Sequence, residues 1–261
     1  MKKFIIIALI AGTVAACATS PLGRRQLILL PDAQLDQMGV SAYAQMKASQ
    51  PVSGDPAVSA YVQCVSNTVL GVAPSPTGWE VTVFSDKGAN AFALPGRKIG
   101  VNTGLLQVAE NQDQLAAVIG HEIAHVLARH SNERMSLQFA TQTGMQLLQQ
   151  INGDDPQKKA ALMAALGIGM QFGVVLPFSR EHESEADVVG MELMAAAGFD
   201  PRANVALWQN MARASGGSPP EFLSTHPSHQ TRIRELEEHM DKAMGIYREA
   251  RASGRIPRCQ P

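Results

Sequence analysis

The sequence has no excess of either charge, since 22 basic and 23 acidic residues leave a formal net charge of -1. It also has no basic stripe and no stretch in which aromatic and basic residues alternate. These absences exclude nucleic acid as a partner, because binding to the phosphate backbone requires concentrated positive charge. Internal repeats, low-complexity tracts and linkers between domains are lacking as well. The 261 residues therefore predict one globular domain with at most a small appendage.

The first apolar run, Phe4 to Ala16, is too short to cross a bilayer comfortably, because a spanning helix needs about 20 apolar residues. It follows the short basic segment Met1-Lys2-Lys3, and this order is typical of an export signal over residues 1–16. The run ends at Val14-Ala15-Ala16-Cys17, which resembles the lipobox of bacterial lipoproteins. The resemblance implies that Cys17 is acylated and becomes the new amino terminus. The alternative is an ordinary secretory signal with an incidental cysteine.

An acylated Cys17 would make residues 17–30 a lipid-anchored segment in front of a domain over residues 31–261. Two or three acyl chains hold a protein stably on a membrane, whereas one does not. Ala18 follows the cysteine, at the position where lipoproteins of the inner membrane typically carry Asp. The resemblance therefore favours the outer membrane, with the domain facing the periplasm.

Two further cysteines, Cys64 and Cys259, form an even pair in a chain expected to reach an oxidising compartment. A disulfide between them would attach the carboxyl-terminal tail to the body of the domain. The alternative is two unpaired thiols.

The pattern of apolar residues predicts helices over residues 31–50 and 55–70. Alternation and β-branched residues predict a strand over residues 79–84, followed by strands over 91–94 and 98–101. Longer helical segments come after them. We therefore expect an α/β fold of the α+β type, mostly helical, in which a small mixed sheet precedes the long helices.

The stretch from Ala160 to Phe178 is almost free of polar residues, but glycines at positions 167, 169 and 173 weaken a regular helix. Burial or a mobile apolar cover over the active site is favoured, and contact with the bilayer is the alternative.

A helix predicted over residues 113–130 has apolar residues around most of its circumference, so it should be buried on nearly all sides. His121, Glu122 and His125 lie inside it, where polar groups are costly unless they are paired or bind a metal. The two histidines are one helical turn apart and can bind one zinc ion together. Glu122 points close to that metal without being in line to bind it. This is the position of a general base that activates water.

A catalytic zinc site needs a third protein ligand, and the helix predicted to begin at Ser179 and to end at Gly198 supplies candidates. At 100° per residue, the acidic residues of this helix fall into two sets on opposite faces. One set should face solvent: Glu181, Glu185 and Glu192. Glu183 and Asp187 share the opposite face with small and apolar residues. We therefore predict Glu183 as the third ligand and Asp187 as the acceptor for the free ring nitrogen of a ligand histidine. The alternative is a charged surface helix without a metal.

Four motifs resemble one known family: Asn90 to Gly96, His121 to His125 continuing into Arg129-His130, Glu183 to Asp187, and Thr225-His226-Pro227. The family is that of the gluzincin-type zinc metalloproteases, which include the prenyl-protein endopeptidases and HtpX, and within it the periplasmic lipoprotein branch. The resemblance covers almost the whole chain and favours Glu183 as the ligand. It implies a zincin-like metalloprotease core, one zinc ion per chain, and proteolytic quality control of misassembled outer-membrane proteins. The tetratricopeptide repeats of some relatives are not found, which puts a partner-docking role of such repeats in doubt.

His226 lies on a predicted loop after the break from Gly216 to Pro220 and before the final helix. A loop histidine could donate a hydrogen bond to the oxyanion, or occupy the fourth zinc position and hold the enzyme inactive. A third alternative is that it only caps the final helix. His130 is expected to be a structural or surface residue, and His182 to point away from the site. His229 and His239 look like ordinary polar positions of the final helix.

The sequence thus predicts a membrane-anchored zinc endopeptidase with His121, His125 and Glu183 as ligands and Glu122 and His226 as catalytic residues. The expected substrates are unfolded or misassembled envelope proteins, bound as an extra strand along residues 90–94, and the outer-membrane assembly machinery is an expected partner. The rival hypothesis is a non-catalytic chaperone or assembly factor of the envelope that keeps zinc for structure. Glu122 argues against this rival, because a purely structural zinc site has no use for a base.

Overall fold

The computed structural model describes residues 17–75, 77–151, 178–214 and 230–260, together with residues 222 and 226. Residues 142–151 are described by their backbone only. The expected export signal over residues 1–16 and residues 160–177 of the apolar stretch lie outside the described residues, as do Gly216 to Pro220 and His229. In the part that is described, no helix has the length and apolar character needed to cross a membrane.

The chain divides into two compact units, and the smaller one comprises residues 1–31 and 131–176. Its described part is an antiparallel hairpin of β1 (Cys17–Thr19) and β2 (Arg25–Leu27), and the helix α5 (His130–Ile151) from Ser131 onward. Arg24 binds the Glu133 carboxylate with two nitrogens at 2.6 Å each, and the Gln26 amide donates to the same carboxylate at 2.9 Å. Residues 17–30, expected as an anchoring segment, therefore form a hairpin held against α5.

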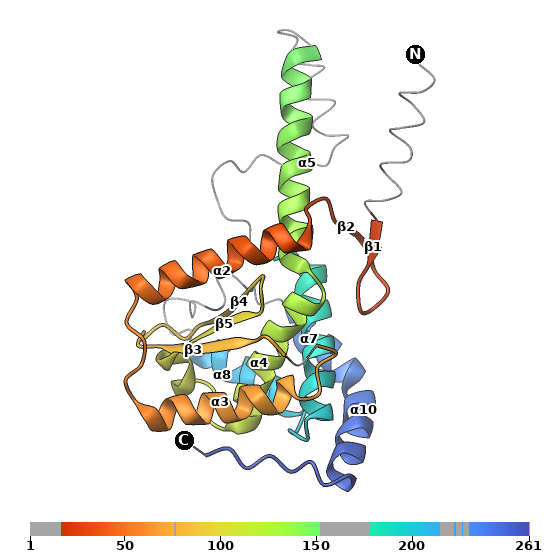
Figure 1. Ribbon diagram of the computed structural model, residues 1–261. Coiled ribbons are helices and arrows are strands. Elements are labelled where there is room, and N and C mark those ends of the chain that lie inside the picture. The colour runs from red at the N-terminus through yellow and green to blue at the C-terminus, as the bar shows by residue number, and fades with distance from the viewer. Residues whose placement is uncertain are drawn as a thin grey trace. The chain divides into compact units, whose positions relative to one another are not determined.

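The larger unit, residues 32–130 and 177–261, contains a three-stranded sheet in the order β3-β5-β4. Strand β5 (Lys98–Asn102) pairs in parallel with β3 (Glu80–Phe84) and antiparallel with β4 (Ala91–Leu94), so the sheet is mixed, as predicted. The helices α2 (Asp32–Ser49) and α3 (Pro56–Leu70) lie on opposite sides of this sheet (Figure 1). Strand β4 stands at an edge of the sheet, beside the helix that carries the histidines.

That helix, α4 (Gln112–Leu127), is buried from Gln114 to His125, as its apolar circumference predicts. The Asn111 side chain caps its amino terminus by accepting from the backbone N–H groups of Asp113 and Gln114. The predicted helix continued to His130, but α4 ends at Leu127. Arg129 takes a left-handed conformation (φ 56°) that turns the chain, and His130 begins α5.

Helix α7 (Arg180–Ala196) crosses α4 at two glycines and packs on its other side against α10 (Gln230–Ala252). As predicted, Ser179 caps its first turn and Gly198, with φ +92°, follows its last. The sequence analysis missed the 3₁₀ turn η1 (Thr103–Gln107), and it also missed α8 (Ala203–Ala214), which packs on α4 and α10. The core of the unit lies between α3, α4, α7, α8 and the sheet.

A disulfide joins Cys64 in α3 to Cys259 in the tail after α10. The tail is also held by hydrogen bonds from the Cys259 N–H to Gln112 Oε1 (2.8 Å) and from the Arg255 side chain to the Ala196 carbonyl (2.8 Å). The tail thus connects α3 with the start of α4 and the end of α7.

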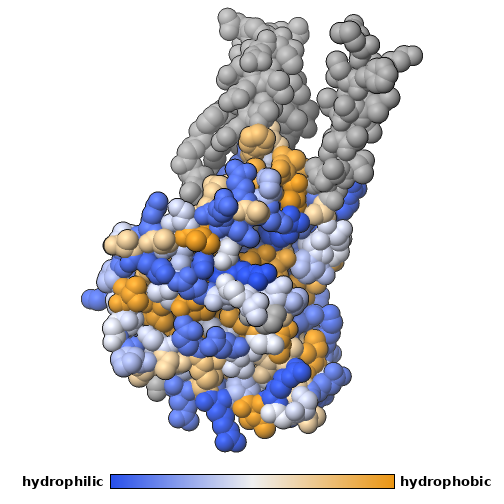
Figure 2. Space-filling model, viewed as in Figure 1, coloured by the Kyte–Doolittle hydropathy of each residue, from blue (hydrophilic) through white to orange (hydrophobic). Residues whose placement is uncertain are grey.

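Hydrophobic and hydrophilic residues are interspersed over the face of the molecule shown in Figure 2. Among the described residues, the exposed large apolar side chains fall in five segments: Leu22 and Leu29 in and after the hairpin, Met38 and Val40 in α2, Val52, Leu137 and Phe139 in α5, and Ile256 in the tail.

Candidate metal centre

Helix α4 places His121, Glu122 and His125 in the buried interior, where all three side chains are at most 4% exposed. Helix α7 adds Glu183, which is fully buried. The two helices approach closely because they cross at Gly120 and Gly190, where neither has a side chain. A Cβ on Gly190 would lie 2.7 Å from the backbone of Gly120 and His121. The crossing therefore brings the Glu183 carboxylate to the two imidazoles.

Four side chains point one donor atom each at a common centre: His121, His125, Glu183 and His226. The Nε2 atoms of His121 and His125 are 3.0 Å apart, and Glu183 Oε1 lies 3.4 Å from His125 Nε2. His226 Nδ1 is 3.2 Å from His121 Nε2 and 3.0 Å from Glu183 Oε1. Neighbouring donors around a tetrahedral zinc ion, with bonds of about 2.0–2.1 Å, are about 3.3–3.4 Å apart. The spacing therefore fits the edges of such a tetrahedron.

The chemistry of this donor set also fits a metal ion. Two imidazole nitrogens and a carboxylate oxygen are the usual ligands of zinc in a site that keeps one further position. Without a metal, the four donor atoms, which all lie within 4.8 Å of one another in a buried space, would need protons between them to avoid opposing their lone pairs. In addition, Glu122 Oε1 is buried and accepts no hydrogen bond from any described residue. The residues present thus fit one zinc ion per chain.

His226 reaches the donor set from the segment between α8 and α10. Its ring is stacked between Phe222, at 4.5 Å, and Phe178, at 5.5 Å between centroids. Its backbone N–H donates to the Phe222 carbonyl at 2.9 Å, and its Nε2 lies 3.4 Å from Glu122 Oε1. Its side chain thus contacts the donor set, Glu122 and the two phenylalanine rings.

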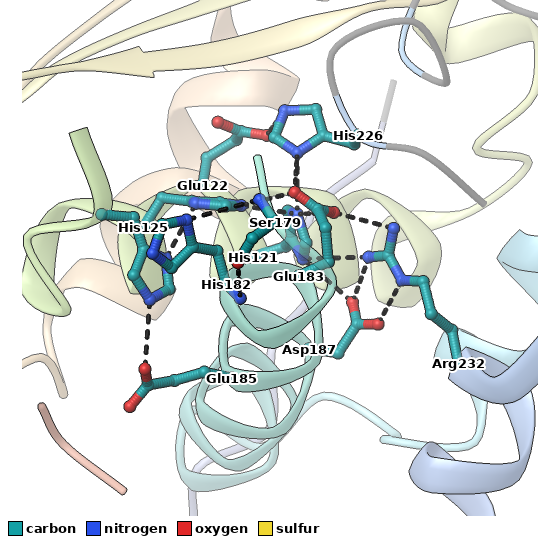
Figure 3. A network of polar contacts seen from close by, with 11 residues as sticks. His121, Glu122, His125, Ser179, His182, Glu183, Glu185, Asp187, His226 and Arg232 are labelled. Carbon is teal, nitrogen blue, oxygen red and sulfur yellow. Dashed lines mark hydrogen bonds and ion pairs between the residues drawn. The ribbon is translucent and has the colours of Figure 1, made fainter. Parts of the chain in front are cut away.

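Asp187 and Arg232 support the donor set from the side of α10 (Figure 3). Asp187 Oδ1 lies 2.9 Å from His121 Nδ1, the nitrogen that faces away from the centre. The buried guanidinium of Arg232 donates two hydrogen bonds of 2.6 Å to Asp187 and reaches Glu183 Oε2 at 2.8 Å. It also lies over the Trp208 ring, 3.8 Å from its centroid. One cation thus holds both carboxylates of the inward face of α7.

The carboxylates of α7 set the protonation of their partners. Burial disfavours a charged His121, but the hydrogen bonds and charges of Asp187 and Glu183 outweigh it and raise the pKa of His121 to about 9. Burial also disfavours ionised Glu183, yet its contacts with His121, His125 and His226 hold the pKa of Glu183 well below its usual value. For Asp187, the charge of Arg232 leads the effects that outweigh burial, so its pKa is lowered as well.

Glu122 behaves differently from Glu183 although both are buried. Burial raises the pKa of Glu122, and the charge of Glu183 adds to this, while His226, His121 and a hydrogen bond from the Ala93 backbone partly oppose it. A carboxylate with a raised pKa suits a group that takes and returns a proton near neutral pH. Ala93 belongs to the edge strand β4, so Glu122 lies between the donor set and that strand.

Residues 56–240 match the family model described as Peptidase family M48, which covers more than half of the chain. The chain belongs to peptidase family M48. The recognised resemblance to gluzincin-type zinc metalloproteases and the expected zincin-like α+β core are therefore confirmed.

Known relatives of this M48 chain include metalloendopeptidases of mitochondria and proteases of bacteria. It is 40% identical to the mitochondrial metalloendopeptidase OMA1 of Schizosaccharomyces pombe over 186 residues, which cover 70% of this chain and 53% of the relative. It is 30% identical to the β-barrel assembly-enhancing protease of Escherichia coli over 208 residues, covering 76% of this chain and 42% of the relative. The protein of the same name from Yersinia pestis is 32% identical over 203 residues, 75% of this chain and 42% of the relative. The chain thus spans about half the length of these relatives, or less.

One prediction about the M48 site is wrong. Glu185 was expected on a solvated face of α7, but it is only 4% exposed and lies 3.2 Å from His130 Nε2. The turn at Arg129 brings His130 against that face, which a helical projection of α7 alone does not reveal. His130 is fully buried, so of the two roles expected for it, structural or surface, the structure supports the structural one. Glu181 is exposed and Glu192 is partly exposed, as expected.

His182 is buried as well, and its ring stacks on that of His130 at 4.5 Å. It shares a capping box with Ser179 at the start of α7 and is not among the four donor residues of the M48 site. His239 bonds to its own helix, at the carbonyl of Glu235.

The sequence analysis missed Arg232, which holds two carboxylates of the M48 site. A signal was available: Arg232 shares one face of the final helix with Leu236 and Ala243, which are both buried. An arginine on an apolar face requires a buried acidic partner, and the inward pair on α7 was already identified.

Proposed function

We propose that this M48 chain is a zinc-dependent endopeptidase that hydrolyses internal peptide bonds of misfolded or misassembled envelope proteins. We further propose that a lipid on Cys17 anchors it to the outer membrane, facing the periplasm. The observation that carries the enzymatic part is the buried set of His121, His125 and Glu183 with the Glu122 carboxylate beside it. The names of the relatives, metalloendopeptidase and protease, support the same reaction.

His121 and His125 would hold the zinc ion through Nε2, and Glu183 through its carboxylate. A zinc ion in such a site acts as a Lewis acid and makes water a nucleophile at neutral pH. Glu122 would take the proton of the attacking water and pass it to the leaving amine, and its raised pKa suits both steps. Asp187 would keep the His121 proton on Nδ1, so that Nε2 stays available for the metal.

The edge strand β4 supports a proposal for how the peptide is bound. An extended substrate could pair with the backbone of Ala91–Leu94, because strand addition at a sheet edge satisfies the hydrogen-bonding groups of any sequence. The Ala93 backbone also bonds Glu122, so a peptide on this edge would lie next to the base. This mode would suit unfolded proteins, whose backbones are accessible.

Replacement of Glu122 by Gln tests the reaction and its rival, a non-catalytic chaperone or assembly factor. We expect Glu122→Gln to keep zinc and to lose turnover of an unfolded protein by several orders of magnitude, because base and ligands are separate groups. The matched control is Glu249→Gln on the exposed face of α10, which should change neither. Normal turnover by Glu122→Gln would reject the mechanism. Absence of turnover in the wild type with zinc bound would favour the rival.

The envelope location rests on the expected export signal and on the lipobox-like residues before Cys17. Among the relatives, the β-barrel assembly-enhancing protease supports a substrate class in outer-membrane assembly and the assembly machinery as a partner. Palmitate labelling and membrane fractionation test the anchor: Cys17→Ser should abolish the label and the association with the outer membrane. Label that persists in this variant would place the lipid elsewhere.

A further inference from the structure

The metal ligand His125 has a neighbour on the side that faces away from the donor set. His130 Nδ1 lies 3.0 Å from His125 Nδ1, and His130 Nε2 lies 3.2 Å from Glu185 Oε2. The two rings meet at 77° with their centroids 4.9 Å apart. Both His130 and Glu185 are buried. A continuous line of polar contacts therefore runs from His125 through His130 to Glu185 on α7.

We propose that His130 and Glu185 are positioning residues that fix the tautomer and ring orientation of His125 through two consecutive hydrogen bonds. The inference rests on the proposed role of His125 as a zinc ligand. It goes beyond that role by assigning the pair of residues that keeps His125 competent to bind.

The chemistry allows one arrangement of protons along this line. If Nε2 of His125 binds a metal, its single proton must be on Nδ1, which then donates to His130 Nδ1. His130 Nδ1 must accept, so the proton of His130 is on Nε2 and is donated to the Glu185 carboxylate. Each nitrogen thus has a defined role, and the carboxylate at the end of the line determines the roles of both rings.

The other ligand histidine, His121, is also oriented by a carboxylate, but through a single hydrogen bond. Asp187 contacts His121 Nδ1 directly at 2.9 Å, whereas Glu185 reaches His125 only through His130. Both carboxylates come from α7, and Figure 3 shows Glu185 and Arg232 on opposite sides of the group. His130 fills the distance between Glu185 and His125. It can do so because Arg129 turns the chain immediately after α4.

The geometry around His130 favours a fixed orientation. Its ring stacks on His182 at 4.5 Å with an angle of 25°, and His182 is itself held in the capping box with Ser179. A ring packed in this way cannot rotate freely to offer a different nitrogen. The stacking therefore favours the ring orientation in which His130 contacts His125 and Glu185.

The test measures the zinc dissociation constant of the full chain by competition with a chromophoric chelator, for variants that separate hydrogen bonding from packing. His130→Phe keeps the ring and its stacking but removes both hydrogen bonds, and we expect zinc to bind about 10- to 100-fold more weakly. His130→Asn places an amide oxygen near the position of Nδ1, and we expect it to recover part of this loss. Glu185→Gln should cause a smaller loss than His130→Phe. Glu192→Gln, a carboxylate of α7 that pairs with Lys242, is the matched control and should bind zinc like the wild type.

Imidazole nitrogen NMR of histidine-labelled, zinc-loaded protein supplies a readout that a loss of packing alone would not give. In the wild type we expect the proton of His125 on Nδ1 and that of His130 on Nε2, and in Glu185→Gln we expect the His130 signals to shift and broaden. Wild-type affinity in both His130→Phe and Glu185→Gln would overturn the proposal. If His130→Phe does not fold, unchanged affinity and unchanged His125 and His130 signals in Glu185→Gln would overturn it. His125→Ala is a reference, because zinc binding that survives this change would refute the proposed metal site itself.

Discussion

His226 occupies the position at which the donor set meets the proposed base. Its Nδ1 lies 3.0 Å from Glu183 Oε1, and its Nε2 lies 3.4 Å from Glu122 Oε1. If zinc binds to this set, His226 Nδ1 would be its fourth ligand, and a reacting water or carbonyl could bind only after His226 leaves. The contacts therefore support the second of the three sequence-based hypotheses, in which His226 holds the enzyme inactive until substrate displaces it.

We expect His226→Ala to retain zinc on three ligands and to raise basal proteolysis of an unfolded substrate. If His226 blocks the site in about 90% of the molecules, its removal can raise the rate of proteolysis at most about tenfold, because the remaining tenth already turns over substrate. The measurement compares the initial rate of proteolysis and the zinc content of His226→Ala with those of the wild type. Loss of turnover with zinc intact would instead support the oxyanion role, and unchanged kinetics would contradict both.

The role of Arg232 depends on the planar shape of its guanidinium as well as on its positive charge. Its planar guanidinium donates twice to Asp187, reaches Glu183 and stacks on Trp208, a set of contacts that a lysine ammonium cannot reproduce. We expect Arg232→Lys to weaken zinc binding by about 10- to 100-fold. Arg232→Met should destabilise the fold by about 3–5 kcal/mol, because it removes the buried cation that pairs with both Asp187 and Glu183.

Arg234→Lys is the matched control for Arg232→Lys. It lies on the same helix, is exposed, and pairs with Glu238 at 3.7 Å. An exposed pair of this kind contributes little, so stability should stay within about 0.5 kcal/mol of the wild type. Equal effects of the two substitutions on zinc affinity and on urea unfolding would argue against a special role of Arg232.

At the scale of elements, the site depends on how closely α4 and α7 approach. A Cβ on Gly190 would lie 2.7 Å from His121 N and 2.9 Å from His121 Cα, and these backbone atoms can give way only if the whole helix shifts. We expect Gly190→Ala to push the helices apart and to cost about 1–3 kcal/mol or more. Because the crossing also joins Glu183 to His121, zinc affinity should fall together with stability in urea unfolding and chelator competition.

Gly245→Ala in α10 separates this steric effect from helix propensity. A Cβ on Gly245 would meet nothing within 4 Å, so alanine should stabilise the helix by up to about 1 kcal/mol. The two substitutions have opposite expected signs although both replace glycine inside a helix. A stabilised Gly190→Ala variant with normal zinc affinity would show that the crossing tolerates a side chain.

At the scale of the whole molecule, the disulfide Cys64–Cys259 links residues 195 positions apart. In the chain-entropy model, a loop of this length restricts the unfolded chain by about 5 kcal/mol, and measured losses on removing a native disulfide are about 2–5 kcal/mol. We expect the double variant Cys64→Ser, Cys259→Ser to lose stability in this range in urea unfolding. Zinc affinity should change less than stability, because the tail contacts α4 at Gln112 and not at the ligands. An unchanged urea midpoint would contradict this prediction.

Local sequence was sufficient to predict several elements and most of the donor set. The helices near 31–50 and 55–70, the strands near 79–84, 91–94 and 98–101, and the cap at Ser179 follow from periodicity and capping chemistry, which act over a few residues. His121, His125 and Glu183 could be named because one turn of helix puts two imidazoles on one side, and because a buried face of α7 carries acidic residues. The helix α8 between Gly198 and the final helix was not predicted from the sequence.

Tertiary structure decided which atoms meet. No local rule states that Arg232, 45 residues after Asp187, binds that carboxylate. A helical projection assigned Glu185 to solvent, because it describes one helix and does not include the turn at Arg129 that places His130 against it. The position of His226 was undetermined for a related reason: its ring packs on the nearby Phe222 and also on Phe178, which comes from a distant part of the chain.

The sequence by itself determined the chemistry. Histidines and carboxylates at helical spacing on a buried face require a metal or a counter-charge, because removing them from water is costly whichever element packs against the helix. The tertiary structure alone decided the geometry. The crossing at Gly120 and Gly190 sets the distance between ligands, and contacts distant in sequence select the side chains that orient each histidine, since such contacts form only when the whole chain has folded.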